Sequence, residues 1–240
     1  SRSEATLSLP QRLYYNANVF RRPPVGYHGR QLEFYQSGVE LLGASGLLAD
    51  AEILLLLLDC LNRLGLQKWN LILEEAGLTR SLFSPFPPSV QDKVRKAIAH
   101  LDRVTLETLP LSPELRERAL FLFDLRGRPA DILQQVASLD LDSKEQEIVN
   151  NLKSLIELLN ESSPNPVELI LDLSLVQTFD YYTGIVFEVV SNTDTSQRIL
   201  GQGGRYDQLL GLYHPQGETY PGIGFCLNIE DLHYVLLSSS

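Results

Sequence analysis

A glutamine and a glutamate four residues apart are the first side chains that could bind a polar ligand together. Gln36 and Glu40 lie in the segment FYQSGVELL, whose aromatic and β-branched residues are typical of a strand. Residues at even spacing on a strand face the same side, and Gly38 between them has no side chain to block that side. The segment is therefore either part of a ligand site or the wet face of a half-buried sheet.

Three arginines occupy the loop between this strand and an earlier one, which we predict at residues 12–20. Arg21, Arg22 and Arg30 lie in RRPPVGYHGR, which also contains two prolines and two glycines. A guanidinium group binds phosphate or carboxylate through two parallel hydrogen bonds, and a loop between paired strands can fold over a ligand. The alternative interpretation is a solvated hairpin tip.

A glycine-rich turn, GQGGRYDQLLG, follows a strand near the C-terminal end of the sequence. Gly201, Gly203 and Gly204 allow a ligand to approach the backbone closely, but no Lys and Ser/Thr follow them as in a Walker phosphate-binding loop. The four histidines and two cysteines have neither metal-ligand nor disulfide spacing. We therefore expect no metal, no cofactor and no assignable catalytic nucleophile.

Composition and charge exclude some classes of function. The net charge of −10 disfavours loose binding to nucleic acid, because phosphate binding relies on clustered Lys and Arg. The longest apolar run, residues 53–58, is far shorter than the roughly 20 residues that span a bilayer. We expect a cytoplasmic protein with 44% hydrophobic residues in a real core and no nucleic-acid or membrane partner.

The order of the predicted elements indicates an α+β fold. Strand-like segments before residue 77 enclose one apolar helix that ends at Gly65, and period-two alternation returns from residue 167 onward. Between them, 78–162 shows helical spacing with Ser, Asp or Pro at the expected helix starts. In the last of these helices, one apolar stripe is expected to be buried, made of Ile148, Leu152, Leu155, Ile156 and Leu159. We predict a discontinuous sheet domain, 1–77 with 163–240, that carries a helical insertion, 78–162.

The motifs together resemble the catalytic core of histidyl-tRNA synthetase, a class II aminoacyl-tRNA synthetase. RLYYNANVFRR with FYQSGVELLG resembles motif 2, and LVQTFDYYTGIVFE and GGRYDQLL resemble the two histidine-recognition motifs. GIGFCLNIEDL lies where motif 3 is expected. The resemblance implies a class II synthetase-like antiparallel sheet flanked by helices.

The same resemblance implies a histidine site. Its residues would be Gln36, Glu40, Tyr182 and Tyr206, with Arg21 as the motif 2 arginine that contacts carboxylate and phosphate. A carboxylate for the ammonium group, amide and phenol groups for the imidazole, and an arginine for the carboxylate form a chemically sensible set. The alternative is that these side chains serve only packing.

The positions that handle ATP depart from the synthetase pattern. Gln177 stands where the synthetase motif LVRGLDYY has an arginine, Asp231 stands where motif 3 has one, and FRxE reads FRRP. Loss of one preorganised donor at a developing charge typically costs on the order of 100- to 1,000-fold in rate. An acid facing a polyphosphate repels the group that an arginine attracts.

These changes are similar to those of the synthetase-like regulatory subunits of ATP phosphoribosyltransferase. The resemblance implies a non-catalytic subunit, a homodimer within a hetero-oligomer, with the short-form ATP phosphoribosyltransferase catalytic subunit as partner. It also implies a role in histidine biosynthesis, with histidine as a ligand in feedback regulation. The alternatives are an active histidyl-tRNA synthetase and a free-standing histidine sensor or scaffold.

Overall fold

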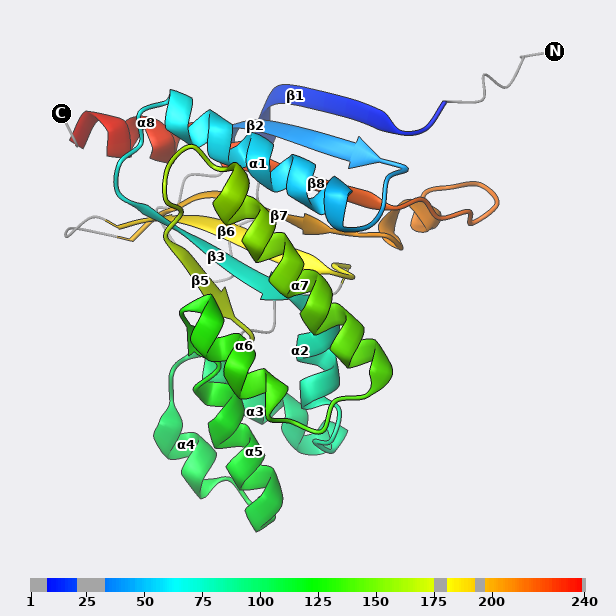
Figure 1. Cartoon of the computed structure of the whole chain (residues 1–240), viewed down its shortest axis with the longest axis vertical. Helices are drawn as coiled ribbons and strands as arrows, with labels where there is room; N and C mark the ends of the chain where they lie inside the picture. The colour runs from blue at the N-terminus through cyan, green and yellow to red at the C-terminus, as the bar shows by residue number, and fades with distance from the viewer. Residues whose placement is uncertain (1–7, 21–32, 175–180, 193–196, 239–240) are drawn as a thin grey trace. The chain divides into compact units, whose positions relative to one another are not determined.

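The computed structural model describes residues 8–20, 33–174, 181–192 and 197–238. The chain forms two compact units, one of Ser1–Trp69 with Glu188–Ser240 and one of Asn70–Phe187. Strands and helices occur in both units, which confirms the predicted α+β class (Figure 1). The borders of the units differ from the predicted domain borders, and the division into core and insertion stays a prediction.

The first unit contains an antiparallel ladder in the order β1-β2-β8-β7. Its strands are β1 (Gln11–Phe20), β2 (Glu33–Leu42), β7 (Ile199–Arg205) and β8 (Gly222–Asn228). All four lie where strands were predicted, but the predicted glycine-rich turn is wrong, because Gly201, Gly203 and Gly204 lie within β7. In β2 the side chains alternate, so that Leu41 is buried on one face while Gln36 and Glu40 are only half-buried on the other.

Helices α1 (Leu47–Arg63) and α8 (Ile229–Ser238) complete this unit, with the short 3₁₀ helix η1 (Leu209–Leu212). Helix α1 contacts β8, and in Figure 1 it runs in front of the strands. It ends as predicted just before Gly65, which adopts φ 74°, a conformation that favours glycine.

The second unit pairs strands that are far apart in sequence. Strand β3 (Trp69–Glu75) runs parallel to β5 (Leu169–Asp172), and the two-residue β4 (Arg126–Gly127) runs antiparallel to β5. Strand β6 (Ile185–Ser191) begins in this unit and ends in the first. The sequence predicted β3, β5 and β6 but not β4.

Strand β5 lies within the segment that the alternation of residues 167–175 predicted as a strand. Its last two residues, Leu171 and Asp172, and the following Leu173 and Ser174 are all buried. Parallel strands usually have both faces covered, which explains why polar residues of this strand are also buried. Buried Asp172 accepts hydrogen bonds from the backbone and hydroxyl of Ser174, and Arg126 of β4 forms an ion pair with it at 3.4 Å.

Six helices lie between β3 and β5 in the chain, and helix starts match the predicted capping chemistry. Helix α5 begins with Ser112 as its N-cap and a proline after it, and α7 begins with Asp142 and Glu145, which form a reciprocal capping box. The helices are α2 (Ala76–Phe83), α3 (Pro88–Ala99), α4 (Arg103–Thr108), α5 (Pro113–Phe123), α6 (Pro129–Ala137) and α7 (Ser143–Ser162).

The predicted apolar stripe of α7 needs one correction. Its last four members are buried, but Ile148 is only half-buried and Val149 next to it is buried instead. Adjacent apolar residues are 100° apart on a helix, so small rotations decide which of the two faces the core.

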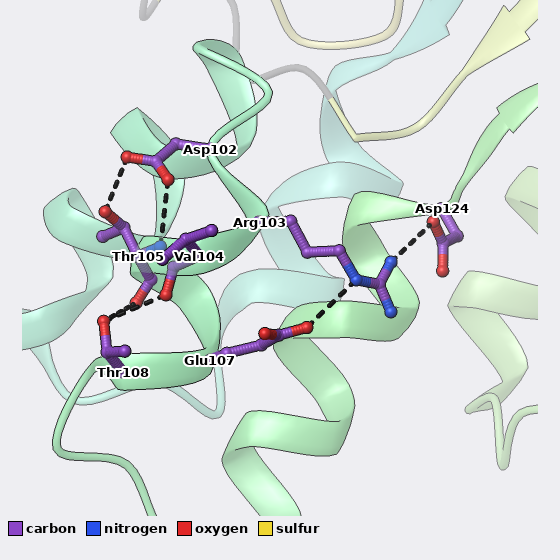
Figure 2. Close-up of polar contacts among 7 residues, drawn as sticks. All are labelled: Asp102, Arg103, Val104, Thr105, Glu107, Thr108 and Asp124. Atoms are coloured by element: carbon purple, nitrogen blue, oxygen red, sulfur yellow. Dashed lines mark hydrogen bonds and ion pairs between the residues drawn. The ribbon is translucent and has the colours of Figure 1, made fainter.

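Polar contacts join α4 to its surroundings in this helical segment (Figure 2). The carboxylate of Asp102 accepts from the backbone N–H of Thr105 at 2.9 Å and from its hydroxyl at 2.6 Å, which caps the helix. Arg103 forms ion pairs with Glu107 and with Asp124 at the end of α5. These contacts are exposed and serve to orient the short helix.

Candidate functional site

Glu40 and Tyr206 meet on one face of the antiparallel ladder. Glu40 lies on β2 and Tyr206 follows the last residue of β7, and the tyrosine hydroxyl donates a hydrogen bond to Oε2 of the glutamate. The backbone N–H of Tyr206 also donates to the carbonyl oxygen of Gly222 at 2.7 Å, which ties the tyrosine to β8. Two predicted site residues from opposite ends of the chain are therefore in direct contact.

Gln36 shares this face, as the strand period predicted. The hydroxyl of Tyr15 on β1 donates to Oε1 of Gln36 at 3.1 Å. The ring of Tyr15 also covers Gly38, because a Cβ added at Gly38 would lie 2.5 Å from a ring carbon. The prediction that Gly38 leaves open room for a ligand is therefore wrong, because the ring of Tyr15 fills that room. On its other side, Gly38 pairs with Cys226 of β8.

Two glycines of β8 make the close approach of Glu40 and Tyr206 possible. A Cβ at Gly224 would collide with the carboxylate of Glu40 and with the carbonyl oxygen of Val39, and one at Gly222 would collide with the ring of Tyr206. Glycine is required here for packing against the sheet, since any side chain would displace the functional groups.

The electrostatics of the face favour a cationic ligand group. Burial raises the pKa of the Glu40 carboxyl, while the hydrogen bond from Tyr206 acts in the opposite direction. Burial, followed by the charges of Cys226 and Glu40, raises the pKa of Tyr15 to about 12, so its hydroxyl stays neutral. A half-buried carboxylate among neutral groups is stabilised when a cation replaces its lost solvation.

The remaining predicted residues of the histidine site lie either in the second unit or outside the described residues. Tyr182 lies in the second unit, where it is buried. Its ring is tilted against that of Tyr181 with 4.6 Å between the centroids, and its backbone oxygen accepts a hydrogen bond from Arg80 at 2.9 Å. Arg21 and Gln177 lie outside the described residues. The membership of these three residues in the site, or their loss from it, stays a prediction.

Asp231 has its own local partners in the first turn of α8. Arg198 forms an ion pair with its Oδ1 at 2.5 Å, and the amide of Asn228 donates to its Oδ2 at 2.7 Å. The guanidinium of Arg198 also lies 4.0 Å from the centroid of the Tyr234 ring. The carboxylate of Asp231 is therefore held by two neighbouring side chains. That it stands in place of the motif 3 arginine, and its effect on a polyphosphate, stay predictions.

A largely buried ionic cluster, which was not predicted from the sequence, lies behind Tyr206. The Arg205 side chain is only 7% exposed and forms ion pairs with Asp50 of α1 at 2.5 Å and with Asp207 at 2.9 Å. Its Nη1 also donates to the carbonyl oxygen of Ala44 at 3.3 Å. The sequence signal for this cluster was the arginine directly before the candidate tyrosine in GGRYD. Adjacent residues of a strand point to opposite faces, so a tyrosine in the site places this arginine on the other face of the sheet.

Among the residues that the structure describes, no group of three or more His, Cys, Asp or Glu side chains is arranged to hold a metal ion. None of the described helices combines the length and apolarity that a membrane span requires.

Comparison with known proteins identifies the family. Residues 2–232 match the family model of histidyl-tRNA synthetase. The chain belongs to the histidyl-tRNA synthetase family. Within this family, the chain is 68% identical over 237 residues to an ATP phosphoribosyltransferase regulatory subunit of Gloeothece citriformis (strain PCC 7424), covering 98% of the chain and 58% of that relative. The predicted resemblance is confirmed, and the chain spans little more than half the length of this curated relative.

Solved structures agree with this assignment to the histidyl-tRNA synthetase family. An ATP phosphoribosyltransferase regulatory subunit/histidyl-tRNA synthetase from Bacillus halodurans C has a TM-score of 0.81 and 30% identity, over 95% of this chain and 59% of that one. An ATP phosphoribosyl transferase (HisG:HisZ) complex from Thermotoga maritima has a TM-score of 0.69 at 20% identity, over 92% of this chain and 74% of that one. The second likeness concerns the fold alone, and both confirm the predicted class II synthetase-like fold.

Proposed function

We propose that this chain is the synthetase-like part of a non-catalytic regulatory subunit. The subunit activates the short-form ATP phosphoribosyltransferase in the cytoplasm, in the first step of histidine biosynthesis, and takes part in feedback regulation by histidine. The observation that carries the proposal is the 68% identity over 98% of the chain to a relative named ATP phosphoribosyltransferase regulatory subunit. The Thermotoga maritima HisG:HisZ complex, which shares the fold, supports a phosphoribosyltransferase as partner.

The absence of aminoacylation rests on two positions. Where the synthetase motifs have arginines, this chain has Gln177 and Asp231. The carboxylate of Asp231 is engaged by Arg198 and Asn228, so this position supplies no positive charge to a polyphosphate. Without an arginine at either sequence position, the negative charge that develops during adenylation lacks the two cations that the synthetase motifs supply.

The ligand of the Glu40 face is proposed to be histidine. Glu40 offers a carboxylate to the ammonium group, and the Tyr206 hydroxyl, which is bonded to it in the structure described here, is able to donate to the ligand instead. The amide of Gln36, whose oxygen is already bonded to Tyr15, has its NH₂ group as a donor for an imidazole nitrogen. Tyr182 and Arg21 would complete the site on the imidazole and carboxylate sides.

Feedback follows from linkage if histidine binds two assembly states unequally. A homodimer of the regulatory subunit within the hetero-oligomer would have an active and an inhibited arrangement, and histidine would favour the second by its differential affinity. A ligand that bound both arrangements equally would change nothing, however tightly it bound.

The first prediction concerns the partner. We expect the full-length protein that contains this chain to co-elute with its short-form ATP phosphoribosyltransferase on size exclusion and to raise its rate of phosphoribosyl transfer. Added histidine should lower that rate in the complex. Failure to co-elute, together with an unchanged transfer rate, would instead support a free-standing histidine sensor.

The same preparation separates the regulatory subunit from an active synthetase. Histidine-dependent exchange of pyrophosphate with ATP should stay at the level measured without histidine. Robust exchange would overturn the non-catalytic proposal, whatever the outcome of the partner experiment.

The second prediction concerns the ligand site. Glu40→Gln should weaken histidine binding in calorimetry by roughly 10- to 150-fold, because a charge-assisted hydrogen bond contributes about 1.5–3 kcal/mol. Burial raises the Glu40 pKa, so this carboxyl takes up its proton at a higher pH than an ordinary glutamate. As the pH is lowered, the histidine affinity of the wild type should therefore begin to fall at that higher pH. Glu40→Gln should lack this component, and comparing the two profiles removes the titration of the histidine ligand itself.

Glu33→Gln is the matched control, because Glu33 lies on the same strand and accepts a hydrogen bond from the exposed side chain of Asn18.

A second measurement uses the two cysteines of the chain, Cys226 on the candidate face and Cys60 on α1, both half-buried. Histidine should slow alkylation of the first thiol and leave the second unchanged. Equal heats for wild type and Glu40→Gln would remove Glu40 from the site.

A further inference from the structure

The ionic cluster behind Tyr206 is an unusual use of charge for a protein interior. Arg205 is 6% exposed as a whole residue, and its guanidinium is held by two carboxylates and one backbone carbonyl. Removing the charges of Arg205 and Asp50 from water is costly, and replacing such groups with apolar residues often leaves stability unchanged or raised. Stability alone therefore does not explain the cluster, and positional control is the better account.

The position of Arg205 at the end of β7 allows it to orient the next residue, Tyr206. Arg205 is the last residue of β7 and pairs with Ile223 of β8, while Tyr206 immediately follows it. The two side chains point to opposite faces: Arg205 toward the start of α1 at Asp50, and Tyr206 toward Glu40. A residue anchored on one face of a sheet fixes the direction of the next side chain on the other face.

Backbone contacts around this point reinforce the same arrangement. Arg205 donates to the carbonyl oxygen of Ala44, and the N–H of Gly43 donates to the carbonyl oxygen of Pro221 at 2.7 Å. These contacts connect the loop after β2 to the residues that flank Tyr206 and to the beginning of β8. The end of β2, which carries Glu40, is thereby held in register with the tyrosine.

We propose that Arg205 is a positioning residue, which holds the hydroxyl of Tyr206 against the carboxylate of Glu40. It acts through Tyr206 and touches no ligand. The inference concerns the site of the proposed function, but its geometry is independent of the ligand. If histidine does not bind, Arg205 still holds the pair together; if Arg205 does not position Tyr206, histidine can still bind.

The test measures the pKa of Glu40 in the full-length protein by ¹³C-carboxyl NMR, with Glu40→Gln to assign the signal. Tyr206→Phe should raise this pKa, because the hydrogen bond from Tyr206 favours the ionised carboxyl. Arg205→Lys should shift it in the same direction by most of that amount, since lysine cannot reproduce the forked contacts. In the Tyr206→Phe background, Arg205→Lys should add nothing, as expected when both changes act on one hydrogen bond.

Arg12→Lys is the matched control. Arg12 on β1 also forms an ion pair with a carboxylate of α1, Glu52, at 2.5 Å, but its side chain is 61% exposed. It should leave the Glu40 pKa unchanged. A purely structural role for Arg205 would lower the melting temperature without moving this pKa beyond the control, and that result would overturn the proposal.

Asp207→Asn covers the case in which Arg205→Lys does not fold. This change removes one carboxylate of the cluster, the half-exposed one, and leaves the ion pair between Arg205 and Asp50 in place. It should produce a smaller shift of the Glu40 pKa in the same direction as Tyr206→Phe. A wild-type Glu40 pKa in Asp207→Asn, with the expected shift in Tyr206→Phe, would also contradict the positioning role.

Discussion

Arg205→Met should lower the free energy of unfolding by about 3–5 kcal/mol, because it leaves the carboxylate of Asp50 buried without its partner. Burial raises the pKa of Asp50, and the charge and hydrogen bond of Arg205 oppose that rise. Without Arg205, the folded-state pKa of Asp50 should rise further. The folded protein then binds more protons than the unfolded chain, so its stability should fall as pH rises through the new pKa.

Urea denaturation at pH 5 and pH 8 checks both parts of this expectation. The loss should be smaller at the lower pH, where a protonated Asp50 needs no cation. Arg12→Met provides the comparison, since its exposed ion pair with Glu52 also joins a strand to α1 and should be thermodynamically silent. Equal effects of the two substitutions would mean that burial does not set the importance of the Arg205 cluster.

Gly224→Ala should disrupt the candidate site by displacing the side chain of Glu40 from β8. The new Cβ would collide with the Glu40 carboxylate, which can rotate away, and with the carbonyl oxygen of Val39, which cannot move without separating β2 from β8. We expect the Tyr206 hydrogen bond and histidine binding to be lost, together with about 1–3 kcal/mol of unfolding stability from overpacking.

Calorimetry with histidine and denaturation of the same variant separate these effects. Gly127→Ala is the control, because a Cβ there would lie 3.7 Å from Ile132, an ordinary contact. Histidine binding at wild-type affinity in a destabilised Gly224→Ala would place the ligand elsewhere than at Glu40.

Local pattern was sufficient to predict most elements of this fold. Aromatic and β-branched residues identified β2, and the even spacing of Gln36 and Glu40 placed them on one face. Helix α1 ends where glycine and arginine predicted its C-terminus, and the capping box of α7 begins at the predicted aspartate. These features depend on contacts within a few residues, which the sequence states directly.

Features that depend on distant contacts were not predictable in the same way. Nothing near Gly38 indicates that the ring of Tyr15 fills its open side, since that contact requires the register between β1 and β2. Burial of Asp172 follows from the pairing of β5 with β3 and from its ion pair with Arg126 of the two-residue strand β4. Strand β4 is too short to produce a period of its own.

The candidate site shows the same division. The resemblance to the histidyl-tRNA synthetase family supplied Tyr206 as a partner for the face that carries Glu40, and the structure places the two in contact. The Arg205 cluster was missed because an arginine beside glycines is equally typical of an exposed turn. Only the position of Asp50 on α1, far away in the chain, explains why this arginine is buried.

The parallel pairing of β3 with β5 has a consequence for the order of folding. All six helices from α2 to α7 lie between these two strands in the chain, so β3 and β5 can pair only by closing a very long loop. Closing such a loop is entropically unfavourable, whereas the contacts within each helix form in about a microsecond. The helices should therefore shorten the effective loop first, and the strand pair should form late. Substitutions in β5 would then act mainly by accelerating unfolding, and those in α7 by slowing folding.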